Sequence, residues 1–235
     1  MCDIQRHRGP DDRGVVSLGH VCLGSDRLSI IDLSEAGHMP MSDENGDWWI
    51  AYNGEVYNFT ELREELIRCG HTFRSRTDTE VVLHAFKQWG EACLDRFVGM
   101  FAFAVYNQQT DTLILARDRF GKKPLYYTQC NEHVFFASEL KTLLSRCDNP
   151  KLNKQRLIEW SLYRNVDFGS RETLIENVFS LLPGHLVKIE RGRIESPRCY
   201  YAPELQIDRD RYLHRSRESH KSISQSVESM IESSV

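Results

Sequence analysis

Cys2 is the first residue of this 235-residue sequence whose side chain could act as a nucleophile. Removal of Met1 would place a free α-amine beside the Cys2 thiol. In unperturbed peptides an α-amine titrates at about 7.7–8.0 and a thiol at about 8.5, so the amine can serve as a base for the thiol near neutral pH. The alternative interpretation of Cys2 is a small residue packed inside the protein.

Asn53 and Gly54 are a second pair with chemical potential, and they lie in the segment YNGEVYNF. An amide side chain beside a glycine N–H can donate two hydrogen bonds to a developing oxyanion, and each such donor is worth roughly 3–4 kcal/mol in enzymes that use one. Asn-Gly is also the commonest dipeptide of tight turns. The sequence leaves both interpretations of this pair open.

Two capped helices follow Asn53 and Gly54. Asn58 and Thr77 each precede a glutamate by three residues, which is the capping-box pattern, and apolar residues then recur on one face until Gly70 and Gly90. Two more helices are predicted over 138–144 and 154–162.

Segments rich in β-branched and aromatic residues predict the strands. They are 14–31, 47–52, two strands within 100–118, two within 125–138, and a hairpin over 178–194 that turns at Pro183 and Gly184. Consecutive hairpins indicate antiparallel sheets, and this order of strands and helices is typical of an α+β protein.

Composition narrows the classes of function. The net charge of −4 provides no basic field for nucleic acid or an anionic membrane, and no apolar run reaches the roughly 18 residues of a membrane span. The N-terminus lacks the pattern of a secretory signal, so we expect a cytoplasmic protein. Seven cysteines occur singly, without a C-x-x-C pair, which predicts neither a metal site nor a disulfide framework.

Seven segments in a fixed order resemble one enzyme family. They are HRGPDD (7–12), DRLSIIDLS (26–34), NGEVYNFTELREEL (53–66), SRTDTEVVL (75–83), GMFAFAVYN (99–107), RDRFGKKPLYY (117–127) and FASELKTLL (136–144). The series resembles the glutaminase domain of glutamine-hydrolysing asparagine synthetases, which are class II, N-terminal-nucleophile amidotransferases. The resemblance extends from Met1 to about Tyr201.

This resemblance implies an α+β fold, a four-layer αββα sandwich of two antiparallel sheets. It also implies that glutamine is hydrolysed to glutamate and ammonia for the ATP-dependent amidation of aspartate. By the same resemblance Arg27 binds the α-carboxylate of glutamine, Asn53 and Gly54 form the oxyanion hole, and Glu55 and Asp78 hold the α-ammonium group. ATP and magnesium are expected only in a synthetase domain absent from this chain, and no metal or cofactor is expected here.

The short distance in sequence between Cys2 and the HRGPDD loop favours the interpretation of Cys2 as a packed residue. Relatives place a strand and a helix between the nucleophile and the HRGPDD loop, whereas five residues separate Cys2 from Arg8, a reach of roughly 20 Å. We therefore expect MCDIQRHRGPDD to be the end of that helix, in a chain truncated at both ends. The nucleophile role of Cys2 stays an alternative.

The composition changes near residue 203. We expect a glutaminase domain over 1–203, followed over 204–235 by a linker and the first helix of a synthetase domain, whose apolar face contains Ile223, Val227, Met230 and Ile231. Expected partners are glutamine and a synthetase-domain chain or a second copy, with no nucleic acid and no membrane. The alternatives are an inactive remnant that binds glutamine or a partner without turnover, and a regulatory glutamine sensor.

Overall fold

The computed structural model describes residues 1–164, 169–203, 224–225 and 227–229. The chain divides into two units, Met1–Tyr201 and Ala202–Val235. Among the described residues, no helix is long and apolar enough to cross a bilayer.

The predicted apolar face near the C-terminus is described at one position. Val227 is helical and exposed, whereas Ile223, Met230 and Ile231 lie outside the described residues.

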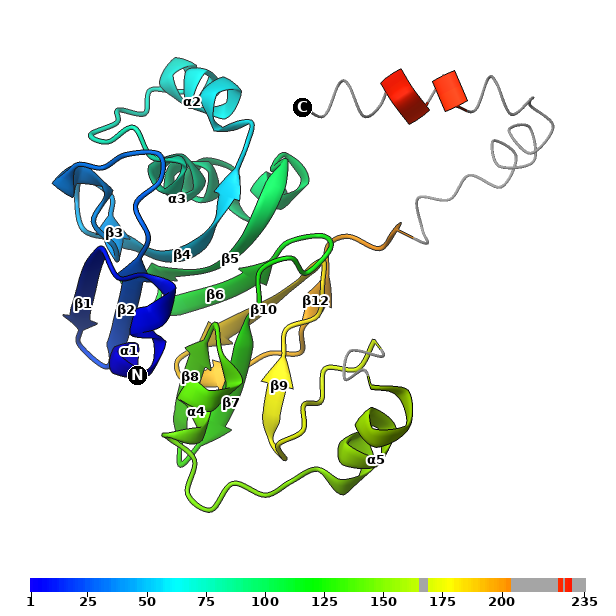
Figure 1. Cartoon of the computed structure of the whole chain (residues 1–235). Helices are drawn as coiled ribbons and strands as arrows, with labels where there is room; N and C mark the ends of the chain where they lie inside the picture. The colour runs from blue at the N-terminus through cyan, green and yellow to red at the C-terminus, as the bar shows by residue number, and fades with distance from the viewer. Residues whose placement is uncertain (165–168, 204–223, 226, 230–235) are drawn as a thin grey trace. The chain divides into compact units, whose positions relative to one another are not determined.

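The largest sheet has seven strands, all paired antiparallel (Figure 1). They are β3 (Met41–Ser42), β4 (Trp48–Val56), β5 (Gly99–Asn107), β6 (Thr112–Arg117), β10 (His185–Glu190), β11 (Arg193–Ile194) and β12 (Arg198–Cys199). The strand order is β11–β10–β6–β5–β4–β3, and β12 also pairs with β10. β4 and β5 pair along their full lengths, from Trp48 opposite Asn107 to Val56 opposite Gly99.

Two smaller antiparallel sheets complete the described strands. β1 (Asp12–Leu18) pairs with β2 (Val21–Arg27), and β7 (Tyr126–Cys130) pairs with both β8 (His133–Ala137) and β9 (Val178–Ser180). The family resemblance implied two sheets, whereas the described residues form three. β2 and β8 each have one neighbour there, so no described strand joins the two smaller sheets.

Two long helices cover one face of the large sheet (Figure 1). These are α2 (Phe59–Arg68) and α3 (Asp78–Trp89), close to the predicted spans. The hydroxyl of Thr77 accepts the N–H of Glu80 at 3.2 Å, as the capping box predicts. Asn58 does not cap α2: its side chain instead donates to the carbonyl of Arg96 and accepts the N–H of Val98, each at 2.9 Å.

The other helical elements range from three to ten residues in length. They are α1 (Cys2–Gln5), α4 (Leu140–Leu144), α5 (Lys154–Tyr163), and 3₁₀ turns at Arg6–Arg8, Glu35–Gly37 and Gly90–Asp95.

The apolar core lies on both faces of the large sheet because side chains alternate along each strand. Phe101 and Phe103 of β5 are almost fully buried and pack toward α2 and α3. Burial of a phenylalanine contributes roughly 2–3 kcal/mol. Ala102 and Ala104 point the other way, toward an apolar cluster that includes Leu23 of β2 and Tyr127 of β7.

A third apolar cluster lies against the sheet of β7, β8 and β9. It contains Ala137, Leu143 and Val178, against which Met1 and Leu140 pack. It therefore connects Met1 and α4 with that sheet.

The predicted hairpin over 178–194 is wrong. β9 pairs with β7 and β10 pairs with β6, so the strands on either side of Pro183 and Gly184 belong to different sheets. The hairpin in this segment joins β10 to β11 instead. β9 and β10 each pair with a strand that is distant in sequence, and a local turn signal does not reveal such pairing.

The tight turn considered for Asn53 and Gly54 is also absent. Both residues lie inside β4, opposite Ala102 and Phe101 of β5. The strand thus continues to Val56, beyond the predicted end at Tyr52.

Candidate functional site

A cavity of about 290 Å³ lies on the face of the large sheet opposite α2 and α3. Small side chains from β4 and β5, including Ala51, Ala102 and Ala104, line it. The end of β2 and the segment that follows it, the end of β8, and the N-terminus of α3 also contribute to the lining. The open edges of β2 and β8 therefore border the same space.

All five residues to which the family resemblance gives a binding or oxyanion role line this cavity. They are Arg27, Asn53, Gly54, Glu55 and Asp78. They come from β2, from β4 and from the first turn of α3, three segments that are separate in sequence. The fold thus brings a guanidinium, an amide and two carboxylates to one wall of a space large enough for a single amino acid.

Asp78 is a buried carboxylate in the first turn of α3. It is 5% exposed, and one oxygen, Oδ2, accepts the Tyr52 hydroxyl at 2.7 Å and the Val56 N–H at 3.0 Å. Both donors are neutral, and the described residues supply no ion pair to this carboxylate. Burial raises the pKa of Asp78, and the hydrogen bonds from Tyr52 and Val56 oppose that effect. A bound ammonium group would offset the cost of burying this charge.

Arg27 holds the segment at the rim of the cavity. It is 8% exposed, and its guanidinium donates to the carbonyl oxygens of Ser34, at 3.3 Å, and Asp32. Gly37 lies against the same group, since a Cβ at Gly37 would be 2.1 Å from the guanidinium Nη2. A guanidinium has five N–H donors, so these contacts leave donors for a carboxylate.

Asn53 and Gly54 differ in what fixes them. The Asn53 amide donates to the hydroxyl of Ser138 at 3.4 Å, across the cavity wall. Gly54 is required by packing, because a Cβ there would lie 2.5 Å from the carbonyl oxygen of Met100 and 2.7 Å from Cα of Phe101. A glycine at 54 therefore lets β4 and β5 approach closely beside the site.

Cys2 is the first residue of α1, as the helix interpretation of MCDIQRHR predicts. It is not among the described residues that line the cavity. Its sulfur lies against Gly24, where a Cβ would be 2.6 Å away. Burial, and then the nearby Asp26, raise the pKa of the Cys2 thiol, which lowers the thiolate fraction that a nucleophile needs.

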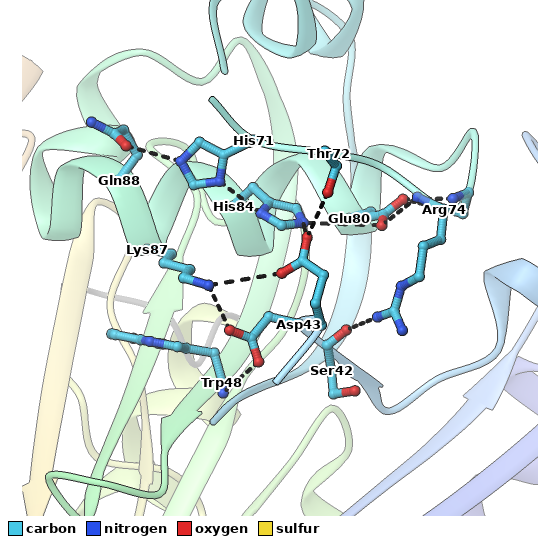
Figure 2. Close-up of polar contacts among 12 residues, drawn as sticks. Ser42, Asp43, Trp48, His71, Thr72, Arg74, Glu80, His84, Lys87 and Gln88 are labelled. Atoms are coloured by element: carbon cyan, nitrogen blue, oxygen red, sulfur yellow. Dashed lines mark hydrogen bonds and ion pairs between the residues drawn. The ribbon is translucent and has the colours of Figure 1, made fainter. Parts of the chain in front are cut away.

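A polar network fixes the half of α3 that lies away from the cavity (Figure 2). Lys87 Nζ lies 2.7 Å from Asp43, a carboxylate that is 1% exposed. His84 Nδ1 is 2.9 Å from His71 Nδ1, and His71 also contacts Gln88 at 2.9 Å. These contacts tie α3 to the segments around residues 43 and 71, and so help to position Asp78 at its first turn.

Three residues of the cavity wall were missed by sequence reasoning. Tyr52 donates to Asp78, Ser138 accepts from Asn53, and Lys123 brings a positive charge to the wall. Tyr52 directly precedes Asn53, so its place in the same motif was the available signal. Ser138 and Lys123 reach the site only through tertiary folding.

The RDRFGKKPLYY segment contains a loop in which side chains bond to the main chain. The Asp118 carboxylate accepts the N–H groups of Phe120, Lys122 and Lys123, each at 3.0 Å. Arg117 donates to carbonyl oxygens, including that of Leu181 at 2.7 Å. The loop is therefore held by side-chain-to-backbone hydrogen bonds.

Metal binding has no geometric support in the described part of the chain. No group of three or more His, Cys, Asp or Glu side chains there is arranged to hold a metal ion.

Comparison with protein families identifies the domain. Residues 1–201 match the family described as "Glutamine amidotransferase domain". The chain belongs to this family. It is a class II glutamine amidotransferase domain related to the N-terminal part of asparagine synthetases. Glutamine is the substrate that membership of the family implies.

Two of the relatives are much longer than this chain. "Asparagine synthetase [glutamine-hydrolyzing] 1" of Bacillus subtilis is 41% identical over 186 residues, which cover 79% of this chain and 28% of the relative. "Amidase chry2" of Gibberella zeae is 34% identical over 204 residues, covering 85% of this chain and 29% of the relative. The chain thus spans between a quarter and a third of the length of these two relatives.

A solved structure supports the fold. The glutamine phosphoribosylpyrophosphate amidotransferase of Bacillus subtilis, complexed with ADP and GMP, matches with a TM-score of 0.52 at 20% identity. The match covers 77% of this chain and 35% of that chain. The mixed α+β fold with antiparallel sheets is therefore shared with that enzyme.

Proposed function

We propose that this chain is the glutamine-binding part of an asparagine-forming amidotransferase. Glutamine binds in the cavity and its side-chain amide is hydrolysed to glutamate and ammonia. A synthetase domain or partner chain, which would hold ATP and magnesium, uses the ammonia to amidate aspartate. The observation that carries the proposal is the convergence of Arg27, Asn53 and Asp78 on one cavity in a glutamine amidotransferase domain.

The charges of the wall suit the two ends of the glutamine backbone. Arg27 receives the α-carboxylate through N–H donors that the rim segment leaves free. Asp78 and Glu55 receive the α-ammonium group, and the burial of Asp78 makes a cationic partner favourable. The Asn53 amide and the Gly54 N–H are the donors for the oxyanion that forms during hydrolysis.

We also propose that the fold is the four-layer αββα sandwich of the family. The three apolar clusters support it. One lies between the large sheet and the helices α2 and α3, the second between the large sheet and the smaller ones, and the third between the β8–β7–β9 sheet and α4. In this arrangement the second sheet layer consists of the β1–β2 and β8–β7–β9 sheets.

A second candidate function is glutamine binding without turnover. The placement of Cys2 favours it, since no cysteine is among the described residues that line the cavity. Under this function the chain senses or retains glutamine, and another protein supplies the chemistry.

Calorimetry and a glutamate-release assay test both candidates. Titration of the purified chain with L-glutamine should show binding, and two matched ligands should bind more weakly: glutaramic acid, which lacks the α-amine, and 4-aminobutyramide, which lacks the carboxylate. No heat of binding for L-glutamine would overturn the proposal.

Glutamate release then separates the candidates. If release occurs, Asn53→Ala should reduce kcat by about 10²–10³. Loss of release in Cys2→Ala would assign the nucleophile to Cys2, and unchanged release would remove Cys2 from the mechanism. Binding without release in the unmodified chain would establish the second candidate.

A further inference from the structure

Two cysteines outside the cavity have their sulfur atoms in contact. The Sγ atoms of Cys130 and Cys147 lie 3.3 Å apart, and both residues are partly exposed. A disulfide needs the sulfurs at about 2.0 Å, so a movement of about 1.3 Å would bring them to bonding distance. The hydroxyl of Thr128 lies 3.7 Å from the Cys130 sulfur and contributes a polar neighbour to the pair.

We propose that Cys130 and Cys147 form a reversible disulfide, which makes them a redox modification site of this domain. The oxidant is a low-molecular-weight disulfide of the glutathione type. The Cys130 thiolate attacks one sulfur of the oxidant, and one glutathione thiolate leaves. The Cys147 thiolate then attacks the Cys130 sulfur of the mixed disulfide, and the second glutathione leaves. The protein loses two electrons and two protons, and the oxidant becomes two molecules of reduced glutathione.

Proximity favours ring closure over a stable mixed disulfide. Because the second thiol is already in contact with the first, its attack is intramolecular and has a high effective concentration. Burial, and then the neighbouring Cys130, raise the pKa of Cys147 to about 11. Closure is therefore faster at alkaline pH, where more of the thiol is ionised.

The disulfide would close a loop that includes part of the cavity wall. Cys130 ends β7, and Cys147 follows α4, so the loop contains β8 and the cavity-lining residues Ala137 and Ser138. The turn between β7 and β8, at Asn131 and Glu132, lies in the same loop. A bond across its base would restrict the motion of β8 and α4 and stiffen that wall of the cavity.

Mass spectrometry of the full chain tests the proposal. After incubation with oxidised glutathione at pH 8, a peptide containing Cys130 should be linked to one containing Cys147, with a loss of about 2 Da. The exposed Cys69 and Cys199 serve as internal controls and should carry glutathione instead. If Cys130 and Cys147 each carry glutathione, or stay free while Cys69 reacts, the proposal is overturned.

A second measurement does not depend on peptide mapping. Oxidation should slow amide hydrogen exchange in residues 131–146 by about tenfold and raise Tm by about 5 °C. Cys147→Ser should abolish both effects, whereas Cys69→Ser should retain them. Equal effects in Cys147→Ser would contradict the assignment. None of these results depends on glutamine binding, so the failure of this proposal and that of the proposed function are distinguishable.

Discussion

Asp43 and Asp78 are both buried carboxylates. Asp78 begins α3, and Asp43 contacts Lys87 of the same helix. The two differ in the charge of the groups that surround them. Asp43 has a cation of its own, because Lys87 Nζ lies 2.7 Å away, and it also accepts the N–H groups of Asp47 and Trp48 at 2.9 and 3.1 Å. Asp78 accepts from the neutral donors Tyr52 and Val56, and no Lys, Arg or His among the described residues forms an ion pair with it.

The pKa values of the two groups shift in opposite directions for this reason. Burial alone would raise the pKa of Asp43, but Lys87 and the N–H groups of Trp48 and Asp47 lower it below its usual value. Burial raises the pKa of Asp78 despite its hydrogen bonds. The difference supports the proposal that Asp43 is a structural carboxylate and that Asp78 binds a cationic group of the ligand.

The largest expected effect concerns glutamine affinity. Asp78→Asn removes the negative charge but keeps the side-chain shape, so we expect affinity to fall about 50-fold, or roughly 2.3 kcal/mol. Asp43→Asn should change affinity less than about twofold. Calorimetry with both variants checks the contrast, and equal losses would remove the distinction between the two carboxylates.

A smaller effect concerns the cation that Asp43 has and Asp78 lacks. Lys87→Met leaves Asp43 buried without a counter-charge, and we expect the free energy of unfolding to fall by about 2 kcal/mol, less than for a pair buried on both sides because Lys87 is 29% exposed. Urea unfolding measures this. Combining Lys87→Met with Asp43→Asn should recover about half of the loss, and no recovery would refute the charge argument.

At Asp78 we expect removal of the charge to raise the free energy of unfolding. A carboxyl with a raised folded-state pKa stabilises the fold when protonated, and that contribution is lost as pH rises through the pKa. At pH 7 Asp78→Asn should therefore raise the free energy of unfolding by about 1 kcal/mol while it weakens glutamine binding. A marked loss of stability in urea would show that Asp78 is structural, like Asp43.

The smallest expected effect involves His84, near Lys87 on α3. Burial lowers the pKa of His84, although Glu44 and Glu80 partly oppose this. In the unfolded chain His84 has its ordinary pKa of 6.5 and so binds a proton more readily than in the folded chain. The free energy of unfolding should therefore fall by roughly 0.5–1 kcal/mol as the pH is lowered from 7.5 to 5.5. Unfolding at both pH values checks this, with His84→Gln as the control that should show a weaker dependence.

Local patterns predicted the helices well. The apolar stripes and Thr77 placed α2 and α3 within about two residues of their observed bounds, because an amphipathic period and a cap are properties of neighbouring residues. The β5–β6 and β7–β8 hairpins were predicted for the same reason.

Pairings between distant segments were not predictable in this way. The partner of β9 is β7, which lies about 50 residues earlier, and the Pro183 and Gly184 signal gave no indication of it. Asn53 and Gly54 looked like a turn because their place in β4 depends on β5. The resemblance to the family predicted that Arg27 and Asp78 share a site, and both line the same cavity. Ser138 and Lys123 also line it, but only the folded structure shows this.

Gly54 of β4 and Gly99 of β5, which lies opposite Val56, limit how the sequence of this domain can vary. A Cβ at Gly99 would lie 2.1 Å from the carbonyl oxygen of Glu55, and one at Gly54 would lie 2.5 Å from that of Met100. The obstacle in each case is main chain, which no compensating side-chain change can move aside. In a library of random variants these two positions should accept few alternatives, although neither has a side chain to contribute.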